Sequence, residues 1–189
     1  MEKWNKGLYI WIAVGVIVAA IVIYFAITGG VLPQQPIEGV QTPQGTVVAP
    51  GASPISKDGL VVTPEGNAVN NAAEPGTPTA PKQSNPLSDA TQIPSQAVKL
   101  TMSSTGITPS SFTVKAGQVV QLSIQAGDSQ SHIFKFDDPS LAAVAVGIGP
   151  GDPIRVIPFN APSAPGTYSF YCDVPGHKTR GEVGQMIVQ

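Results

Sequence analysis

The chain has 189 residues with 10 basic and 12 acidic side chains, and its net charge of −2 excludes the dense positive surface of a nucleic-acid-binding protein. Its one cysteine, Cys172, excludes a disulfide within the chain, so this thiol is a packing residue or a reactive or metal-binding group. The 20 glycines and 19 prolines, well above average usage, predict a long irregular segment beside the folded part.

The N-terminal part contains an uncharged apolar stretch, LYIWIAVGVIVAAIVIYFAIT, at residues 8–28. As a helix it would span about 32 Å, the thickness of the hydrocarbon core of a bilayer. Lys3 and Lys6 precede the stretch and the next basic residue is Lys57, which places the N-terminus in the cytoplasm. We therefore expect residues 1–28 to form a short cytoplasmic N-terminus and a single-pass signal anchor in the cytoplasmic membrane. The C-terminal part would be extracytoplasmic, in the periplasm or at the cell surface.

A cleaved signal peptide is the alternative interpretation of this stretch. The apolar core of a signal peptide has about 7–15 residues and is followed by an A-x-A-like site of small residues. The stretch in this chain is longer, and the sequence FAITG that ends it is a poor match to such a site. An uncleaved transmembrane anchor is therefore favoured.

Residues 29–96 are predicted to be a flexible linker rich in proline and glycine. The segment has no aromatic residue and only scattered apolar ones, so it lacks the apolar area that would offset the entropy of ordering. The sequences GTVVAP and DGLVVTP within it are compatible with short strands of a reduced β-domain, but neither has an evident partner. The expected role of the linker is that of a tether.

Residues 97–189 have the pattern of an all-β domain. Apolar and polar residues alternate in VKLTM, in the two strands of ITPSSFTVKAGQVVQLSIQAGD and in HIFKF, and the segments IRVIPF, TYSFYC and QMIVQ are further strands. The glycine-rich segment 145–153 is predicted to be a loop near the end of the domain that carries the histidines. Many short strands separated by Gly/Pro turns predict a β-sandwich or barrel.

The one cysteine of the chain and both of its histidines lie in this domain. His132 begins the strand HIFKF, Cys172 ends the strand TYSFYC, and His177 follows across the turn DVPG. Each residue alone is more often a packing residue than a ligand. Together, one thiolate and two imidazoles are the ligand set of a trigonal copper centre with a weak axial group. Zinc is the other candidate, although structural zinc prefers four firm ligands and usually more thiolates.

The ligand segment also resembles that of the cupredoxins, the blue-copper proteins of the plastocyanin and rusticyanin kind. Cys172, the triplet Pro-Gly-His ending at His177, Gly181 and the closing strand from Gly184 match the family's pattern, and the resemblance covers residues 97–189. It implies a Greek-key β-sandwich that binds one copper ion through His132, Cys172 and His177. Where the family carries the axial methionine, this chain has Glu182, which is either the axial ligand or a surface carboxylate. Met186 lies inside the closing strand and is interpreted as a core residue.

The expected function is that of a membrane-anchored copper protein that carries single electrons to a partner protein, without catalysis of its own and without a small-molecule substrate. One alternative is a copper-binding or copper-delivery module without electron transfer. The other is a red-copper site with open coordination, similar to that of the nitrosocyanins, in which Glu182 would be a ligand. Lys178 and Arg180, which flank His177, are interpreted as solvated charges in preference to a basic rim for an acidic partner.

Overall fold

The computed structural model describes residues 47–189 of the chain. The predicted transmembrane span and the first part of the predicted linker lie outside the described residues. Within residues 47–189, no helix combines the length and the apolar character that crossing a membrane requires.

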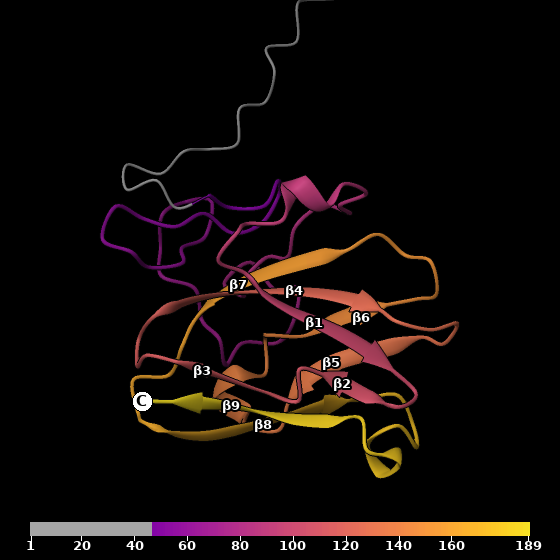
Figure 1. Ribbon diagram of the computed structural model, residues 1–189. Coiled ribbons are helices and arrows are strands. Elements are labelled where there is room, and N and C mark those ends of the chain that lie inside the picture. The colour runs from indigo at the N-terminus through magenta and orange to yellow at the C-terminus, as the bar shows by residue number, and fades with distance from the viewer. Residues whose placement is uncertain (1–46) are drawn as a thin grey trace, which may run out of the picture. The chain divides into compact units, whose positions relative to one another are not determined.

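The described chain forms two β-sheets that pack face to face, with short 3₁₀ helices in the connections (Figure 1). One sheet has the strand order β2-β1-β4-β7 and the other has the order β3-β9-β8-β5-β6. The strands are β1 (Val98–Ser103), β2 (Gly106–Thr108), β3 (Ser111–Val114), β4 (Val119–Ala126), β5 (His132–Phe136), β6 (Val146–Ile148), β7 (Arg155–Asn160), β8 (Gly166–Cys172) and β9 (Val183–Val188). The 3₁₀ helices are η1 (Ala90–Gln92), η2 (Pro139–Leu141) and η3 (Lys178–Arg180). The prediction of an all-β sandwich is confirmed.

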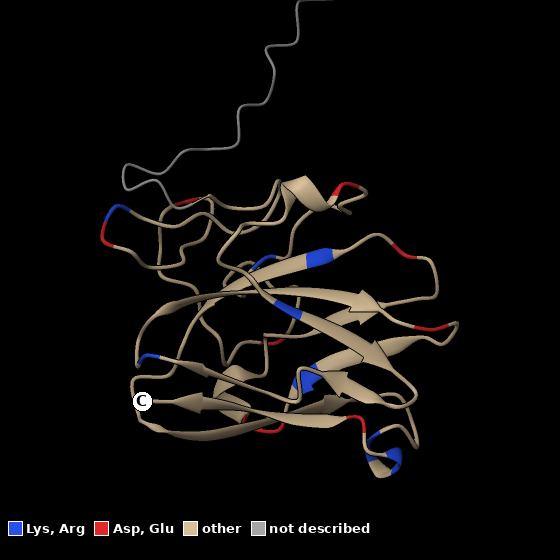
Figure 2. Ribbon diagram, viewed as in Figure 1, with Lys and Arg blue, Asp and Glu red and all other residues tan. Residues whose placement is uncertain are grey.

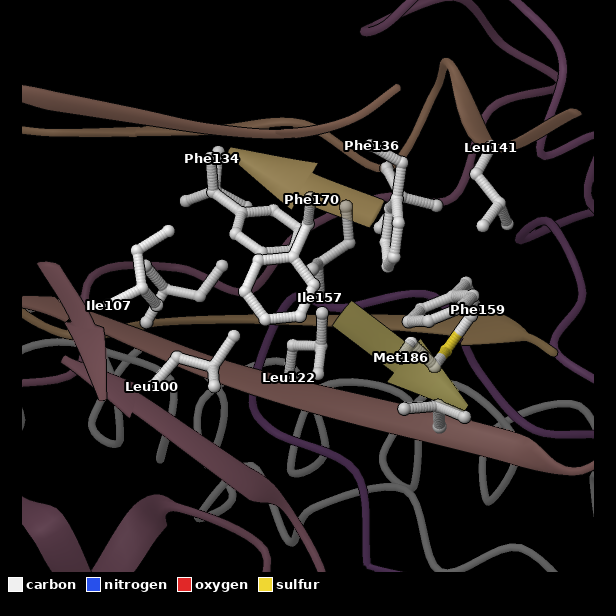
Figure 3. Packing of buried hydrophobic residues seen from close by; sticks show 14 of the residues in the cluster. Leu100, Ile107, Leu122, Phe134, Phe136, Leu141, Ile157, Phe159, Phe170 and Met186 are labelled. Atoms are coloured by element: carbon white, nitrogen blue, oxygen red, sulfur yellow. The ribbon is translucent and has the colours of Figure 1, made fainter. Parts of the chain in front are cut away.

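The core lies between the two sheets and is built by the alternation seen in the sequence. Phe134 and Phe136 of β5 and Phe170 of β8 enter from one sheet, and Leu122 of β4 and Ile157 of β7 enter from the other (Figure 3). The ring centroid of Phe170 lies 5.3 Å from that of Phe134 and 6.0 Å from that of Phe136. Fully burying one such side chain contributes about 1.5–3 kcal/mol. This packing holds β5 and β8 side by side, and so it brings His132, the first residue of β5, close to Cys172, the last residue of β8.

Strand β6 corrects the prediction that residues 145–153 form a loop, which holds for residues 149–153 but not for 146–148. Val146–Ile148 pairs antiparallel with β5, and Ile148 is the register partner of His132. The strand has only three residues, so its alternation is too short to distinguish it from a loop without knowledge of its partner. The expectation that this segment lies near His132 is nevertheless met.

The prediction of a flexible linker is wrong for residues 47–96, which pack on the sandwich. Leu87 pairs with Ile154 through two backbone hydrogen bonds of 2.9 and 3.1 Å, and it is buried beside Val156 of β7. The side chain of Gln121 on β4 donates to the carbonyl of Val47 at 3.0 Å. Isolated backbone pairings within the segment join Ile55 to Val61, and also residues 62 and 68. Four apolar residues of the segment thus find partners at β7 and just before it, in a cluster with Val156 and Ile154: Ala49, Ala52, Leu87 and Ile93. The segment lies on the side of the sheet that contains β4 and β7 (Figure 1).

Candidate metal centre

Four side chains converge at one end of the sandwich, where β5 begins and β8 ends. His132, Cys172, His177 and Glu182 each direct one ligand atom into a cluster in which all these atoms lie within 4.8 Å of one another. Three of them, His132, Cys172 and Glu182, are fully buried, and His177 is 7% exposed. The structure thus brings together all four residues that the sequence singled out.

The pairing of strands β5, β8 and β9 accounts for this convergence. Phe134 pairs with Cys172, so His132, two residues earlier on the same face of β5, lies beyond the end of β8 on the same side. The β8–β9 ladder ends with Tyr171 opposite residue 183, and the N–H of Cys172 then donates to the carbonyl of Glu182 at 3.0 Å. Residues opposite each other in an antiparallel pair project their side chains to the same face. Cys172 and Glu182 therefore both face the cluster.

The loop between β8 and β9 supplies the second histidine. His177 N–H donates to the carbonyl of Val174 at 3.0 Å, and the N–H of Glu182 donates to the carbonyl of His177 at 3.2 Å. The helix η3 then ends at Gly181, whose φ of 99° lies in the left-handed region that glycine adopts without strain. This turn returns the chain to β9 and sets the Glu182 side chain beside His177.

The distances within the cluster fit a common metal ion. The Cys172 Sγ atom lies 3.8 Å from His132 Nδ1 and 3.5 Å from His177 Nδ1. The Glu182 carboxylate lies 2.8 Å from His132 Nδ1 and 3.0 Å from His177 Nδ1. Nitrogen and sulfur ligands bind Zn²⁺ at about 2.0–2.3 Å, so ligand atoms that share an ion of this kind lie roughly 3–4 Å apart. The two distances from Cys172 lie in this range and the two from Glu182 lie at or just below its lower end, so the donor set fits a common metal ion with small movements of the side chains.

Asp128 holds His132 from the opposite side. His132 Nε2 lies 3.0 Å from Asp128 Oδ1, and the two carboxylate oxygens also accept hydrogen bonds from the N–H groups of Ser104, at 2.6 Å, and Gln130, at 2.9 Å. These bonds, led by that of Ser104, hold the pKa of Asp128 well below its ordinary value. A carboxylate at Nε2 fixes the proton on that nitrogen and leaves Nδ1 as the ligand atom, as is common for metal-binding histidines. Sequence reasoning missed Asp128, because nothing in the polar loop AGDSQS marks it.

The Cys172 thiol needs a cation to ionise readily. Burial is the largest cause that raises the pKa of Cys172, and the neighbouring Glu182 carboxylate raises it further, against the lowering effect of the backbone N–H groups of Ile133 and Val174. The N–H of Ile133 lies 3.3 Å from the sulfur. A thiol with a raised pKa stays protonated near neutral pH unless a bound metal stabilises the thiolate.

Glu182 is a buried carboxylate with polar partners on every side. Burial raises its pKa, but hydrogen bonds, first from His132 and then from Arg180, Cys172 and His177, outweigh burial and bring the pKa below its ordinary value. The side chain is therefore charged at neutral pH. Of the two alternatives left open by the sequence, a surface carboxylate is wrong, because Glu182 is fully buried in the cluster.

Met186 is confirmed as a core residue. It is fully buried among the side chains between the sheets (Figure 3) and its register partner on β8 is Tyr168. At a rise of about 3.3 Å per residue, Met186 lies roughly 13 Å along the strand from Glu182. The thioether is therefore remote from the cluster.

The two basic residues of η3, seen at the tip of the β8–β9 loop in Figure 2, are both paired. Lys178 forms an ion pair with Asp137, and its Nζ atom lies 4.0 Å from the centroid of the Tyr171 ring. Arg180 donates to Glu182 Oε1 at 2.9 Å. Both side chains are solvent-exposed, as interpreted from the sequence, but Arg180 also contacts the cluster directly, which the sequence did not indicate.

Comparison with known proteins agrees with this geometry. The family described as "Cupredoxin-like domain" matches residues 79–187. No curated protein matches the chain. The matched region therefore begins before β1, within the residues 47–96 that pack on the sandwich.

Among solved structures, reduced auracyanin from Roseiflexus castenholzii is 25% identical and covers 50% of this chain and 98% of its own, with a TM-score of 0.43. Auracyanin A, a blue copper protein from Chloroflexus aurantiacus, is 22% identical over 49% of this chain and 99% of its own, with a TM-score of 0.39. Oxidised plastocyanin from Dryopteris crassirhizoma is 26% identical over 49% of this chain and 100% of its own, with a TM-score of 0.37. Because all three TM-scores are below 0.5, the family assignment rests on the sequence match over residues 79–187, which covers more than half of the chain. The chain belongs to the family of cupredoxin-like domains.

Proposed function

We propose that this chain is a mononuclear copper protein that carries single electrons while anchored to the outer face of the cytoplasmic membrane. The observation that carries the proposal is the convergence of buried His132, Cys172, His177 and Glu182 ligand atoms within 4.8 Å. One thiolate with two imidazoles is the donor set of copper electron-transfer sites, and membership of the cupredoxin-like family supports copper over zinc. Bound copper supplies a one-electron couple between Cu(I) and Cu(II).

The residues of the chain provide a rigid, dry donor set for that ion. His132 and Cys172 lie on paired strands, and the Asp128 carboxylate fixes the orientation of the His132 ring. A scaffold of paired strands resists a change of donor positions when the charge on the metal changes, and this keeps reorganisation small. The fourth donor in this proposal is the Glu182 carboxylate. A hard anionic oxygen favours Cu(II) over Cu(I) and lowers the reduction potential relative to a thioether.

The anchor and the partner are parts of the same proposal. The apolar residues 8–28 and the asymmetry of the flanking lysines support a single-pass membrane anchor with the copper domain outside. With residues 47–96 packed on the sandwich, the connection left between anchor and domain is residues 29–46, whose fully extended length is at most about 65 Å. Confinement this close to the membrane raises the effective concentration of the domain near membrane-bound redox partners.

The test is visible absorption and electron paramagnetic resonance of the full chain loaded with Cu(II) in mild detergent. We expect an intense thiolate-to-copper band that is lost in Cys172→Ala. In Glu182→Met, we expect the band to shift and the copper hyperfine splitting to narrow. A Cys172→Ala variant that keeps the band, or a wild-type chain that binds no copper, would contradict the copper assignment. Thermal unfolding of the metal-free variants verifies that each one is folded.

A copper-delivery module without electron transfer is the second candidate, and the buried charged carboxylate of Glu182 is the observation that favours it. A donor set that stabilises Cu(II) is suited to holding and transferring the ion. Cyclic voltammetry of the copper-loaded chain separates the two functions. Fast reversible electron transfer supports the electron carrier, and slow or absent redox cycling supports the delivery module.

A further inference from the structure

Arg180 links the ligand loop to the loop that carries Asp128. The same guanidinium nitrogen donates to Glu182 Oε1 at 2.9 Å and to Gln130 Oε1 at 2.9 Å. The Arg180 side chain is 42% exposed, whereas the Glu182 side chain is fully buried. Arg180 thus reaches from the surface onto a carboxylate that solvent does not contact.

These contacts close a ring of hydrogen bonds around His132. On one side, Glu182 Oε2 lies 2.8 Å from His132 Nδ1. On the other side, Asp128 Oδ1 lies 3.0 Å from His132 Nε2 and accepts from the N–H of Gln130 at 2.9 Å. The side chain of Gln130 then returns to Arg180, which holds Glu182. Both ring nitrogens of one ligand are therefore connected through Arg180.

The two oxygens of Glu182 have different partners because of this arrangement. Oε1 accepts from Arg180 and lies 3.0 Å from His177 Nδ1, whereas Oε2 lies 2.8 Å from His132 Nδ1 and 3.0 Å from His177 Nδ1. Without the guanidinium, nothing would hold Oε1 at its present place, and the carboxylate could rotate relative to the two histidines. The other basic residue of η3, Lys178, does not substitute for Arg180, because it is paired with Asp137.

We propose that Arg180 is a positioning residue of the metal centre, which fixes the rotation of the Glu182 carboxylate within the cluster. The proposal rests on the proposed function for the identity of the ion, and on the hydrogen-bond ring for the role of Arg180. The planar guanidinium donates from a fixed geometry to two acceptors, which a lysine ammonium does not reproduce. The positioning role therefore depends on the planar geometry of the Arg180 guanidinium as well as on its charge.

The experiment compares the wild-type full chain with Arg180→Gln, Arg180→Lys and the control Lys178→Gln, using Cu(II) as the probe. Lys178→Gln removes the same charge two residues away without touching Glu182. We expect Arg180→Gln to change the copper hyperfine splitting and the thiolate-to-copper band, and to lower Cu(II) affinity about 10–100-fold, the range for lost outer-shell partners. Arg180→Lys should rescue only part of each change, and Lys178→Gln should match the wild type.

A second readout does not depend on copper. The two histidines of the chain are both in the cluster, so the ¹⁵N signals of their rings in the metal-free full chain report on it directly. Arg180→Gln should shift these signals and Lys178→Gln should not. Unchanged ring signals in Arg180→Gln would overturn the positioning role whether or not the chain binds copper. Complete rescue by Arg180→Lys in both readouts would also overturn it, because charge alone would then suffice. A wild-type chain that binds no copper, with ring signals that still respond to Arg180→Gln, would refute only the proposed function.

Discussion

Removal of the Asp128 carboxylate is expected to weaken copper binding without removing a ligand. Asp128 lies 3.0 Å from His132 Nε2 and also accepts the N–H groups of Ser104 and Gln130. Loss of an outer-shell partner of a metal-binding histidine typically costs 10–100-fold in affinity, which corresponds to about 1.4–2.7 kcal/mol. Asp128→Asn keeps one oxygen, which can still face His132 and accept from the N–H of Gln130, but its NH₂ group then faces the N–H of Ser104; we expect it near the 10-fold end. Asp128→Ala loses all three bonds, so we expect it near the 100-fold end.

The assay is a titration of the full chain with Cu(II) in competition with a chelator of known affinity. Asp138→Ala is the matched control, because Asp138 caps η2 by accepting the N–H of Ser140 at 2.9 Å and does not contact the cluster. Its copper affinity should equal that of the wild type. Equal affinities for wild type, Asp128→Asn and Asp128→Ala would refute the role assigned to Asp128 and would make its contact with His132 incidental to metal binding.

Three further predictions concern stability of the metal-free chain. Leu87→Ala should lower the free energy of unfolding by about 2–5 kcal/mol, because it leaves a cavity in a buried site. The control Leu60→Ala, at a position 43% exposed in the same segment, should stay within about 0.5 kcal/mol of wild type. Equal thermal midpoints for Leu87→Ala and wild type would indicate that the segment is a free linker. Gly184→Ala should lower the free energy of unfolding by about 1–3 kcal/mol or more, because an added Cβ would collide with the Phe170 ring. Chemical denaturation measures this change, and an unchanged denaturation midpoint would contradict the packing of Gly184 against Phe170. The N–H of Ser104, followed by the His132 ring and the N–H of Gln130, lowers the pKa of Asp128. Its charge therefore stabilises the fold above the unfolded pKa of about 3.9, and this contribution is lost as pH falls below that value. The stability difference between wild type and Asp128→Asn should therefore shrink in acid, and a difference that grows there would refute the sign.

The strands in which apolar and polar residues alternate regularly were predictable from the sequence. In β5, His132, Phe134 and Phe136 share a face, and this pattern alone identified both the strand and the direction of the histidine. The ligands were found through their chemistry, because Cys172 and two imidazoles in one small domain suggest a metal. Local periodicity and ligand type are properties of the sequence itself, which explains the success.

The missed features depend on partners that are distant in the sequence. Strand β6 is defined by its pairing with β5, and Leu87 is buried only because the outer face of β7 lies against it. Asp128 and Arg180 lack any local signature, since their roles follow from contacts with His132 and Glu182 across the fold. A composition rich in proline and glycine indicated the absence of regular strands in residues 47–96, but it does not distinguish a free chain from one packed on a neighbouring sheet.

One connection between two strands holds three of the four donors. Cys172, His177 and Glu182 all lie within residues 172–182, a segment closed by the hydrogen bond from the Cys172 N–H to the Glu182 carbonyl, and only His132 comes from elsewhere. A replacement confined to this segment would exchange most of the donor set and leave the packing between the sheets intact. Metal preference and folding are therefore separable traits that can evolve at different rates, and transplanting this one segment onto a related sandwich should carry the chemistry with it.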